Sequence, residues 1–319
     1  MSMRFYPRLA VAMGQLFLVG LCLTACVQRN DLSTDDVQPQ LFVSASGVEM
    51  VFLSGGTFMM GSNEGDDDER PLHQVILSPF VIDVHEVTHE MFARAELPNP
   101  SRWQDDPQKP VESVRWRDAK IYCNERSLQE GLEVCYDETK SGLPCDFKAS
   151  GYRLPTEAEW EFACRAGSQG DYVCTTSNKL KSYAYYNANS DNQTQPVGTR
   201  KANRWGLFGM HGNVCEWCQD VYDPEYYQIS PMLDPRGPST SAGDVKRVIR
   251  GGSWKASERM CRSSFRQGQR TGDTDACFST DYCGFRCVRR MAIETWNLLQ
   301  KNQVENGVTT PKANSSDSK

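Results

Sequence analysis

The segment GYRLPTEAEWE, at residues 151–161, carries the clearest local structural signal in the chain. Thr156 can accept a hydrogen bond at the start of a helix, and Glu159, three residues later, completes a capping-box pattern. The apolar side chains of this stretch are Trp160, Phe162, Ala163 and Cys164. We therefore predict a helix from Thr156 to about Arg165 that buries an apolar surface.

A second helix is predicted from Trp116 to about Gln129, because apolar residues recur there at helical spacing. Short strands are predicted at residues 48–53, 74–84 and 247–250, where β-branched and aromatic residues cluster. Most of the remaining chain is punctuated by glycine and is interpreted as long loops. Ordering such loops costs entropy, so we expect disulfides or bound cations to support them.

The N-terminus has the parts of a secretory signal, with two arginines followed by an apolar stretch over residues 9–23. That stretch is short for a membrane-spanning helix. The run LTAC, at residues 23–26, resembles the lipobox of bacterial lipoproteins, in which the cysteine receives the lipid. We expect residues 1–25 to be a lipoprotein signal peptide and Cys26 to carry the anchor. An ordinary signal peptide with a chance cysteine is the alternative.

The rest of the chain divides into three parts. Residues 26–40 are polar and acidic and are interpreted as a flexible tether. Residues 292–319 are rich in Asn, Ser, Thr and Lys and are predicted to be a disordered tail. Residues 41–291 have the length of one domain and contain no linker. We therefore expect a single domain outside the cytoplasm, held at a membrane of the cell envelope by its lipid.

Charge and cysteine content narrow the range of partners. The net charge is −6 and no basic block is present, which argues against nucleic acid. Of the 13 cysteines, Cys22 leaves with the signal and Cys26 is lipidated, so eleven remain in the domain. Most of them should pair in an oxidising compartment, and the odd number leaves at least one over.

The sequence leaves most of the individual disulfide pairings open. Cys135 and Cys145 bracket a short segment and could close it. Zinc is the alternative use for the spaced pairs Cys215-x-x-Cys218 and Cys283-x-x-x-Cys287.

Short motifs follow one another through the whole domain, and together they resemble the formylglycine-generating enzyme family, the sulfatase-modifying factors. The resemblance covers nearly all of residues 41–291. The matching blocks are MVFL (50–53), GGTFMMGS (55–62), ERP (69–71), EVT (86–88), PV (110–111), Val114, Trp116, DA (118–119), YC (122–123), GYRLPTEAEWE (151–161), PVG (196–198), GLF (206–208), GNV (212–214), EW (216–217), RGGSW (250–254), RS (262–263) with Arg266, and GFRC (284–287).

Membership in this family implies an irregular α+β fold similar to a C-type lectin, with little regular secondary structure. It also implies a disulfide between the first helix and the last strand, here between Cys123 and Cys287. Family members that make formylglycine use oxygen and copper(I), held by two cysteines, to convert a substrate cysteine into an aldehyde.

The copper ligands transfer only in part. The two positions downstream of Gly-Gly-Ser are occupied here by Ala256 and Cys261, so one soft ligand is missing. This departure puts copper-dependent formylglycine formation in doubt. Cys261 is the remaining catalytic candidate, and Ser253 matches a residue of the family's active-site pocket. The structural alternative for Cys261 is a disulfide, with Cys218 as its candidate partner.

The family's calcium sites also transfer in part. At one site, Gly212 and Val214 would offer carbonyl oxygens and Glu216 a carboxylate, which are ligands that calcium prefers. Gly209 stands there in place of a side-chain ligand. The other site would use the side chain of Asn189 and the carbonyl of Ser190. The alternative is that these residues only order turns.

A rival motif, HEVTH at residues 85–89, matches the pattern of zinc metalloproteases. That chemistry needs both histidines on one helix. The segment Val81–Val84 reads as a strand, and Thr88 is better placed to cap a helix that begins at His89. The two histidines would then lie on different elements.

Three functions remain open from the sequence. The first is an oxidoreductase-like member that acts on an exported protein or a small molecule in the cell envelope. The second is a non-catalytic lipoprotein that binds a partner or builds an envelope assembly. The third is the metalloprotease. The substrate or partner is not identified by the residues alone.

Overall fold

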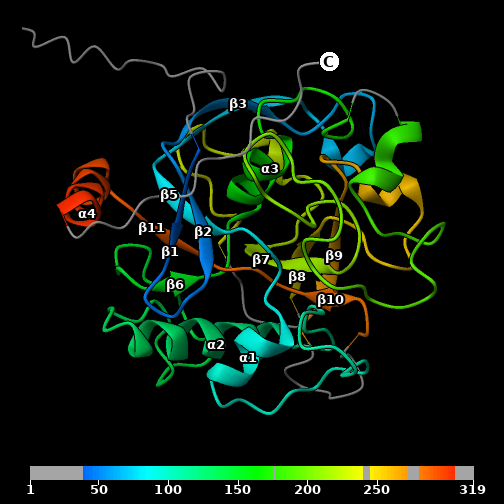
Figure 1. Ribbon diagram of the computed structural model, residues 1–319. Coiled ribbons are helices and arrows are strands. Elements are labelled where there is room, and N and C mark those ends of the chain that lie inside the picture. Colours follow the sequence, from blue (N-terminus) through cyan, green and yellow to red (C-terminus); the bar gives the residue numbers. More distant parts are fainter. Residues whose placement is uncertain (1–38, 175–176, 240–244, 272–279, 306–319) are drawn as a thin grey trace, which may run out of the picture. The chain divides into compact units, whose positions relative to one another are not determined.

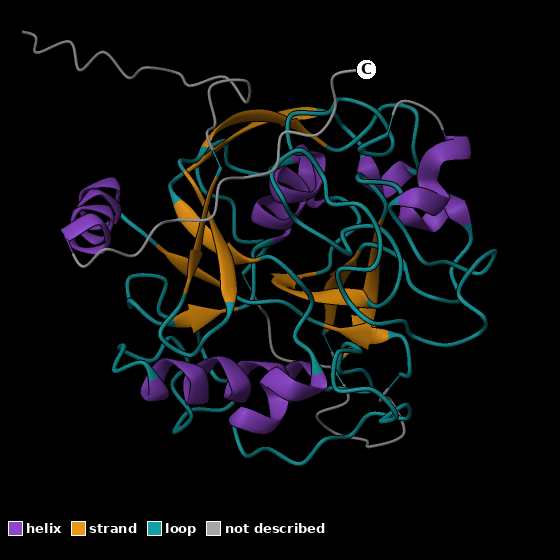
Figure 2. Ribbon diagram, in the orientation of Figure 1, coloured by secondary structure: helices purple, strands orange, loops and turns teal. Residues whose placement is uncertain are grey.

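The computed structural model describes residues 39–174, 177–239, 245–271 and 280–305. The predicted signal peptide, Cys26 and the tether up to residue 38 lie outside the described residues. Figures 1 and 2 show short strands and few helices joined by long loops. Within the described residues, no helix is both long enough and apolar enough to cross a bilayer.

Within the described residues, the strands form three sheets, accompanied by four α-helices and four short 3-10 helices. A five-stranded sheet has the order β1-β2-β5-β11-β6, a four-stranded sheet the order β10-β7-β8-β9, and β3 pairs with β4. The helices are α1 (His89–Arg94), α2 (Trp116–Gln129), α3 (Glu157–Arg165) and α4 (Ile293–Glu305). The strands are β1 (Gln40–Val43), β2 (Glu49–Leu53), β3 (Gly56–Met60), β4 (His73–Leu77), β5 (Phe80–Asp83), β6 (Tyr152–Arg153), β7 (Cys215–Val221), β8 (Lys246–Arg250), β9 (Arg266–Arg270), β10 (Cys283–Gly284) and β11 (Val288–Arg290).

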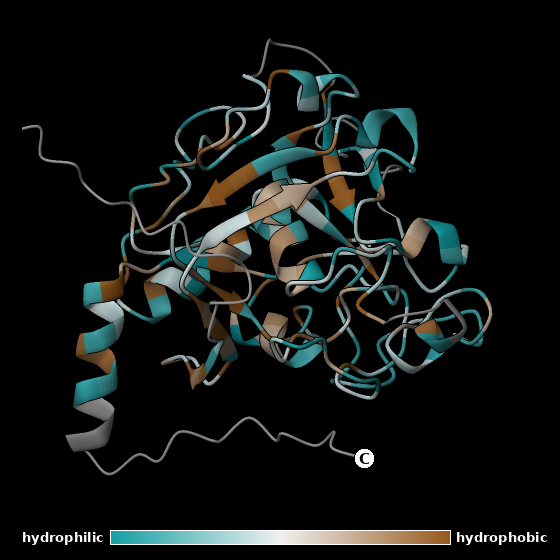
Figure 3. Cartoon of the chain, turned by 90° about the horizontal axis from the view of Figure 1, so that it is seen from above, coloured by the Kyte–Doolittle hydropathy of each residue, from teal (hydrophilic) through white to brown (hydrophobic). Residues whose placement is uncertain are grey.

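Both faces of the five-stranded sheet are covered. In β2, Met50 and Phe52 join the hydrophobic cluster that contains α2, whereas Val51 and Leu53 join the cluster that contains α3. Neighbouring residues of a strand point to opposite faces, so a strand buried on both faces needs a continuous apolar run. The run in β2 meets this need, and Figure 3 shows apolar residues in brown along several strands.

The predicted helices and strands are confirmed. Helix α3 begins after Thr156, whose side chain accepts from the backbone of Glu159, and the capping box is complete. Helix α2 has the predicted bounds, and Thr88 caps α1 as expected. The predicted strand at residues 74–84 is divided into β4 and β5 by a short turn.

Buried arginines join the sequence motifs to one another. Arg250 of the RGGSW motif lies at the end of β8, with its Nη1 3.0 Å from Glu157 Oε1 and its Nη2 2.5 Å from Glu161 Oε2. Both glutamates belong to α3. Arg266 of β9 makes a second, bidentate pair with Glu157 at 2.8 Å. All four side chains are buried. The charges therefore hold α3 against the four-stranded sheet.

The predicted disordered tail is wrong for its first part, because residues 293–305 form α4. Trp296 is 2% exposed, and its ring stacks on Phe52 at 4.5 Å and meets Phe42 edge-on at 5.4 Å. Its Nε1 donates to Gln40 Oε1 at 3.1 Å. These partners lie more than 200 residues away in sequence, so local composition could not reveal them. Residues 306–319 are outside the described part of the chain.

The Arg250 pairs provide a stability test. We predict that Arg250→Ala lowers the free energy of unfolding by about 3–5 kcal/mol, because it leaves Glu157 and Glu161 buried with less counter-charge. Arg102→Ala is the control, since Arg102 is 64% exposed in its pair with Asp281 and its loss should cost less than about 1 kcal/mol. Urea denaturation measures both values. Equal losses would contradict the role given to Arg250.

Candidate functional site

The RGGSW motif forms a turn that packs directly on the candidate thiol. Gly252 has φ +73°, and a Cβ at this position would lie 2.7 Å from Cys261 Sγ, so only glycine fits. Ser253 and Ala256 are buried beside this turn, and the amide of Ala256 donates to the carbonyl of Ser253 at 2.9 Å. The structure therefore brings together Ser253, Ala256 and Cys261.

The environment of Cys261 does not activate its thiol. The side chain is 0% exposed, and burial raises the pKa of the thiol to about 12. The nearby His211 donates through Nδ1 to the Cys261 carbonyl at 2.7 Å, so this nitrogen is not available as a base for the thiol. Burial also lowers the pKa of His211 to about 4. A reactive cysteine needs a thiolate, which these surroundings disfavour.

A second buried thiol lies near this site, and nothing in the sequence singled it out. Cys164 Sγ lies 3.9 Å from His211 Nε2 and 3.7 Å from Ser263 Oγ. Burial raises its pKa to about 12 as well. Cys164 is on α3, and only the fold brings it to the segment that follows RGGSW. Neither thiol is disposed to ionise, and Ala256 supplies no ligand, so these residues do not fit the family's copper pair.

The candidate disulfide between Cys261 and Cys218 is not supported. Cys261 packs in a cluster with Tyr172 and Leu180, whereas Cys218 belongs to the cluster around α3. Spacing in sequence could not place them, because the clusters to which they belong are assembled by the fold.

The first predicted calcium site contains a protein cation. Both oxygens of Glu216 are engaged by Arg286, from Nε to Oε2 at 2.7 Å and from Nη2 to Oε1 at 2.8 Å. Trp160 Nε1 also donates to Glu216 Oε2 at 2.9 Å. Gly212 and Val214 precede this strand, and the amide of Gly212 bonds to the carbonyl of Gly251. The carboxylate of Glu216 is thus already neutralised, and this set does not fit calcium well.

A second buried carboxylate explains why glycine stands at position 209. A Cβ on Gly209 would lie 2.1 Å from Glu86 Oε2, so the Glu86 side chain fills the space of a larger residue. Asn213 Nδ2 donates to Glu86 Oε1 at 3.1 Å, whereas Oε2 has no hydrogen-bond partner. Burial raises the pKa of Glu86 to about 7. The sequence placed Glu86 in the EVT block but gave no sign of its burial.

The second predicted calcium site is internally bonded. Asn189 Nδ2 donates to the carbonyl of Ala184, and its Oδ1 accepts from the amide of Tyr186, both at 2.9 Å. The carbonyl of Ser190 accepts from Gln195 Nε2 at 2.8 Å. These bonds order a turn, which is the structural alternative for the pair. Calcium binding here remains a prediction.

The zinc interpretation of HEVTH is wrong. His85 follows β5 and stacks on Phe208, whereas His89 starts α1 and lies 2.8 Å from Asn99 through its Nδ1. Glu86 points to Asn213 instead. Among the residues that the structure describes, no group of three or more His, Cys, Asp or Glu side chains is placed to hold a metal. This also argues against the zinc alternative for Cys215, Cys218, Cys283 and Cys287.

Among the described residues, the sulfur atoms of two cysteine pairs lie close together. Cys123 of α2 and Cys287 lie with their sulfur atoms 3.7 Å apart, as the family resemblance implied. Cys215 and Cys283 face each other in the parallel pair β7–β10, with sulfur atoms 3.1 Å apart. The sequence did not single out this second pair, because β10 is only two residues long. Cys135 and Cys145 lie in one hairpin-like segment, in which the backbones of Tyr136 and Cys145 form an isolated antiparallel β-bridge.

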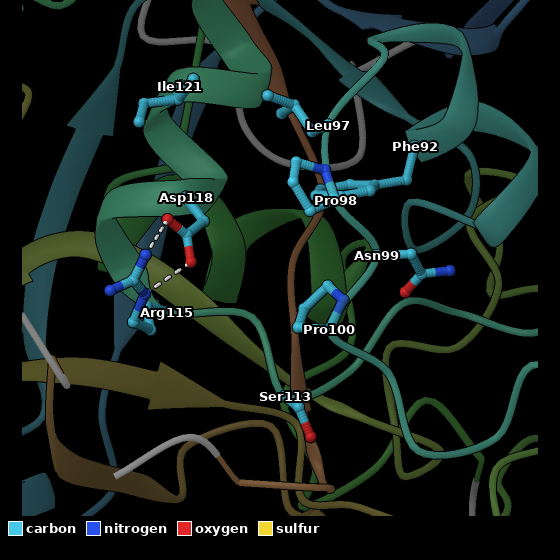
Figure 4. A pocket seen from close by; sticks show the side chains of 9 residues that line it. All are labelled: Phe92, Leu97, Pro98, Asn99, Pro100, Ser113, Arg115, Asp118 and Ile121. Atoms are coloured by element: carbon cyan, nitrogen blue, oxygen red, sulfur yellow. Dashed lines mark hydrogen bonds and ion pairs between the residues drawn. The ribbon is translucent and has the colours of Figure 1, made fainter. Parts of the chain in front are cut away.

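A pocket of about 460 Å³ lies between α2 and the loop after α1. Figure 4 shows Leu97, Pro98 and Pro100 on the loop and Ile121 on the helix. Beside the start of α2, Arg115 and Asp118 form a bidentate pair at 2.7 and 2.8 Å, marked by dashed lines in Figure 4. Ser113, which also lines the pocket, has a positive φ of 61°, which is strained for a residue with a side chain. Apolar walls beside a few polar groups are typical of ligand sites.

Glu86 generates a prediction about pH. Its folded pKa of about 7 exceeds the value of 4.5 expected when unfolded, so stability from its neutral form is full below about pH 4.5 and is lost as pH rises toward 7. Glu86→Gln should remove this loss, raising the free energy of unfolding relative to the wild type by about 3 kcal/mol between these pH values. Urea denaturation across this range measures the difference. A difference that does not change with pH would contradict the assignment.

Comparison with known proteins agrees with this geometry. The sequence model of the family described as "Sulfatase-modifying factor enzyme 1-like domain" matches residues 37–291. A serine/threonine-protein kinase, pkn1 of Chlamydia caviae, is 35% identical over 80% of this chain, which spans 39% of that kinase. The chaperone protein LppX of Paenibacillus barcinonensis is 32% identical, over 68% of this chain and 82% of LppX.

The fold is shared with a solved structure. Variable protein 1 of Treponema denticola superposes with a TM-score of 0.70 and 29% identity, covering 79% of this chain and 99% of that protein. The match confirms the predicted irregular α+β, C-type-lectin-like fold. With the family model covering the whole predicted domain, the chain belongs to the family of sulfatase-modifying factor enzyme 1-like domains.

Proposed function

We propose that this chain is an exported, lipid-anchored member of the family whose domain binds another exported protein in the cell envelope and does not form formylglycine. The observation that carries the proposal is the state of Cys261. A buried thiol with a pKa of about 12, beside Ala256 and without a base, is suited to packing and not to oxidation chemistry.

The pocket between α1 and α2 supports a binding role. Phe92, Leu97 and Ile121 offer apolar walls, and the Arg115–Asp118 pair adds both charges to the lining. A protruding apolar side chain of a polypeptide would gain burial there, while its backbone amides could bond to the polar groups. We therefore assign the pocket to a side chain of the partner protein.

The relatives support the same class of function. LppX carries the name of a chaperone protein, and this chain covers most of its length. A chaperone acts on another polypeptide, so the proposed partner is an exported protein that is folding or being assembled. The LTAC motif at residues 23–26 supports anchoring through Cys26.

The proposed compartment predicts two disulfides. Cys123 with Cys287 and Cys215 with Cys283 have neighbouring sulfur atoms, and an oxidising envelope would convert each pair to a disulfide. Mass spectrometry of peptides cleaved without reduction should find both links in protein taken from the envelope. Protein made in a reducing cytoplasm is the control and should lack them. Free thiols at all four positions in envelope protein would contradict export.

Complementation of a deletion tests the function itself. In cells that lack the protein, the amounts of folded exported proteins are measured, and variants are then supplied. A chain with Ser253→Ala and Cys261→Ser should restore the wild-type amounts, because neither group performs chemistry. Leu97→Asp should fail to restore them, because it places a charge in the apolar pocket.

Two controls accompany this experiment. Leu128→Asp makes the same chemical change on a residue that is 61% exposed and outside the pocket, so it should restore function. Cys26→Ser should lose both function and incorporation of labelled fatty acid. The contrary outcome is a double variant, Ser253→Ala with Cys261→Ser, that is folded and present in normal amounts yet fails to restore the exported proteins. That outcome would instead favour an oxidoreductase that acts in the envelope.

A further inference from the structure

One end of the five-stranded sheet brings the tether close to a group of basic residues. Gln40 of β1 pairs with Phe52 of β2, and the next position of β2, Leu53, pairs with Phe80 of β5. Phe80 in turn pairs with Arg290 of β11. Gln40 and Arg290 therefore lie at the same end of the sheet, separated by two strands. The predicted tether enters the domain at this end.

A pocket of about 350 Å³ at this end has an excess of positive charge. Of its two acids, Glu159 is paired with Arg153 at 2.7 Å, whereas Asp234 accepts a hydrogen bond from Ser78 at 2.6 Å and keeps its negative charge. Three other cations line the pocket, and within the described residues none has an acidic partner. They are Lys148, Arg236 and Arg290, all exposed. The lining of the pocket therefore has a net positive charge, which favours binding of an anion.

Two exposed apolar residues directly precede the pocket residues Asp234 and Arg236 in the chain. Met232 and Leu233 are 51% and 53% exposed, although large apolar side chains usually gain by burial. Hydrogen bonds to β4 hold the backbone of this segment in place. The amide of Ile76 donates to the carbonyl of Met232 at 2.7 Å, and the carbonyl of Ile76 accepts from the amide of Asp234 at 2.9 Å. We call Lys148, Arg236, Arg290, Met232 and Leu233 the basic face. Cations beside exposed apolar groups are typical of surfaces that bind membranes.

We propose that the basic face rests on the membrane that holds the lipid anchor, with the phosphate of an anionic phospholipid in the pocket. The inference rests on the proposed anchoring at Cys26. Only 14 positions separate Cys26 from Gln40, which limits the span between lipid and domain to about 50 Å. A tether of this length keeps the domain near the membrane, and the basic face lies at the end of the sheet where the tether enters.

This orientation leaves the partner pocket free. The chain leaves β5 at Asp83, the opposite end of that strand from Phe80, and continues to α1 and the loop that lines the partner pocket. With the Phe80 end toward the lipid, the loop at residues 97–100 is directed away from the membrane. The anchored domain would then present its binding pocket to exported proteins.

Vesicle binding tests the inference without the anchor. The mature full-length chain with Cys26→Ser, which cannot be lipidated, is sedimented with vesicles of phosphatidylglycerol and phosphatidylcholine in equal parts, or of phosphatidylcholine alone. We expect binding to the first and little to the second, weakening as salt rises past about 0.15 M. Neutralising Lys148, Arg236 and Arg290 to glutamine should weaken binding at least about tenfold, since each cation near an anionic surface contributes.

A matched variant controls for total charge. Lys179, Lys181 and Lys201 are exposed lysines outside the basic face, and their replacement by glutamine should leave vesicle binding unchanged. Met232→Ser with Leu233→Ser should weaken binding without changing its salt dependence. Unchanged thermal unfolding shows that each variant is folded.

Other outcomes would overturn the inference. One is the absence of binding to anionic vesicles. Another is an equal loss of vesicle binding in the two triple-glutamine variants. The third is a chain that binds inorganic phosphate or an acidic peptide but does not bind vesicles. Labelling of the wild-type chain with fatty acid is measured separately. If the chain incorporates fatty acid but its basic face does not bind vesicles, this inference alone is contradicted. If the chain incorporates no fatty acid, the anchoring proposed above is contradicted.

Discussion

The buried pairing of Arg250 with Glu157 and Glu161 is the constraint on which the rest of the structure depends. A guanidinium can be buried only when carboxylates and carbonyls surround it, so β8 and α3 must approach in one arrangement. That arrangement places the RGGSW turn against α3 and fixes Cys261 beneath Gly252. Arg286 acts similarly at Glu216. In a domain with so many loops, such pairs define the relative positions of elements that little regular structure connects.

The same interactions determine what the site can do. The Cys261 thiol has no exposure to solvent, the Nδ1 of His211 donates to the Cys261 carbonyl and is not available as a base, and position 256 holds alanine in place of a second sulfur ligand. Around Glu216 the buried pairs supply Arg286 where a metal would otherwise balance the charge. The pairs that stabilise the fold do not include Ser253, Ala256 or Cys261, so the fold does not depend on chemistry at those positions. These observations support the binding function proposed above.

Much of the fold could be predicted, because its signals are local. The capping box at Thr156 and the apolar spacing from Trp116 depend on neighbours within one helix, and both helices have the predicted bounds. Helix α4 was missed, because Trp296 gains its stability from Phe42 and Phe52 on distant strands. For the same reason the proximity of Cys215 to Cys283 could not be predicted, nor could the burial of Glu86 beside Gly209. These depend on which segments meet in space.

The central claim is that this domain has kept the fold of its family and binds protein without oxidising cysteine. The most direct measurement incubates the purified chain with copper, oxygen and a cysteine peptide taken from a sulfatase, and follows the mass of the peptide. We predict that the peptide keeps its cysteine and that no aldehyde appears. Conversion of the peptide to the formylglycine form, with loss of that conversion in Cys261→Ser, would contradict it.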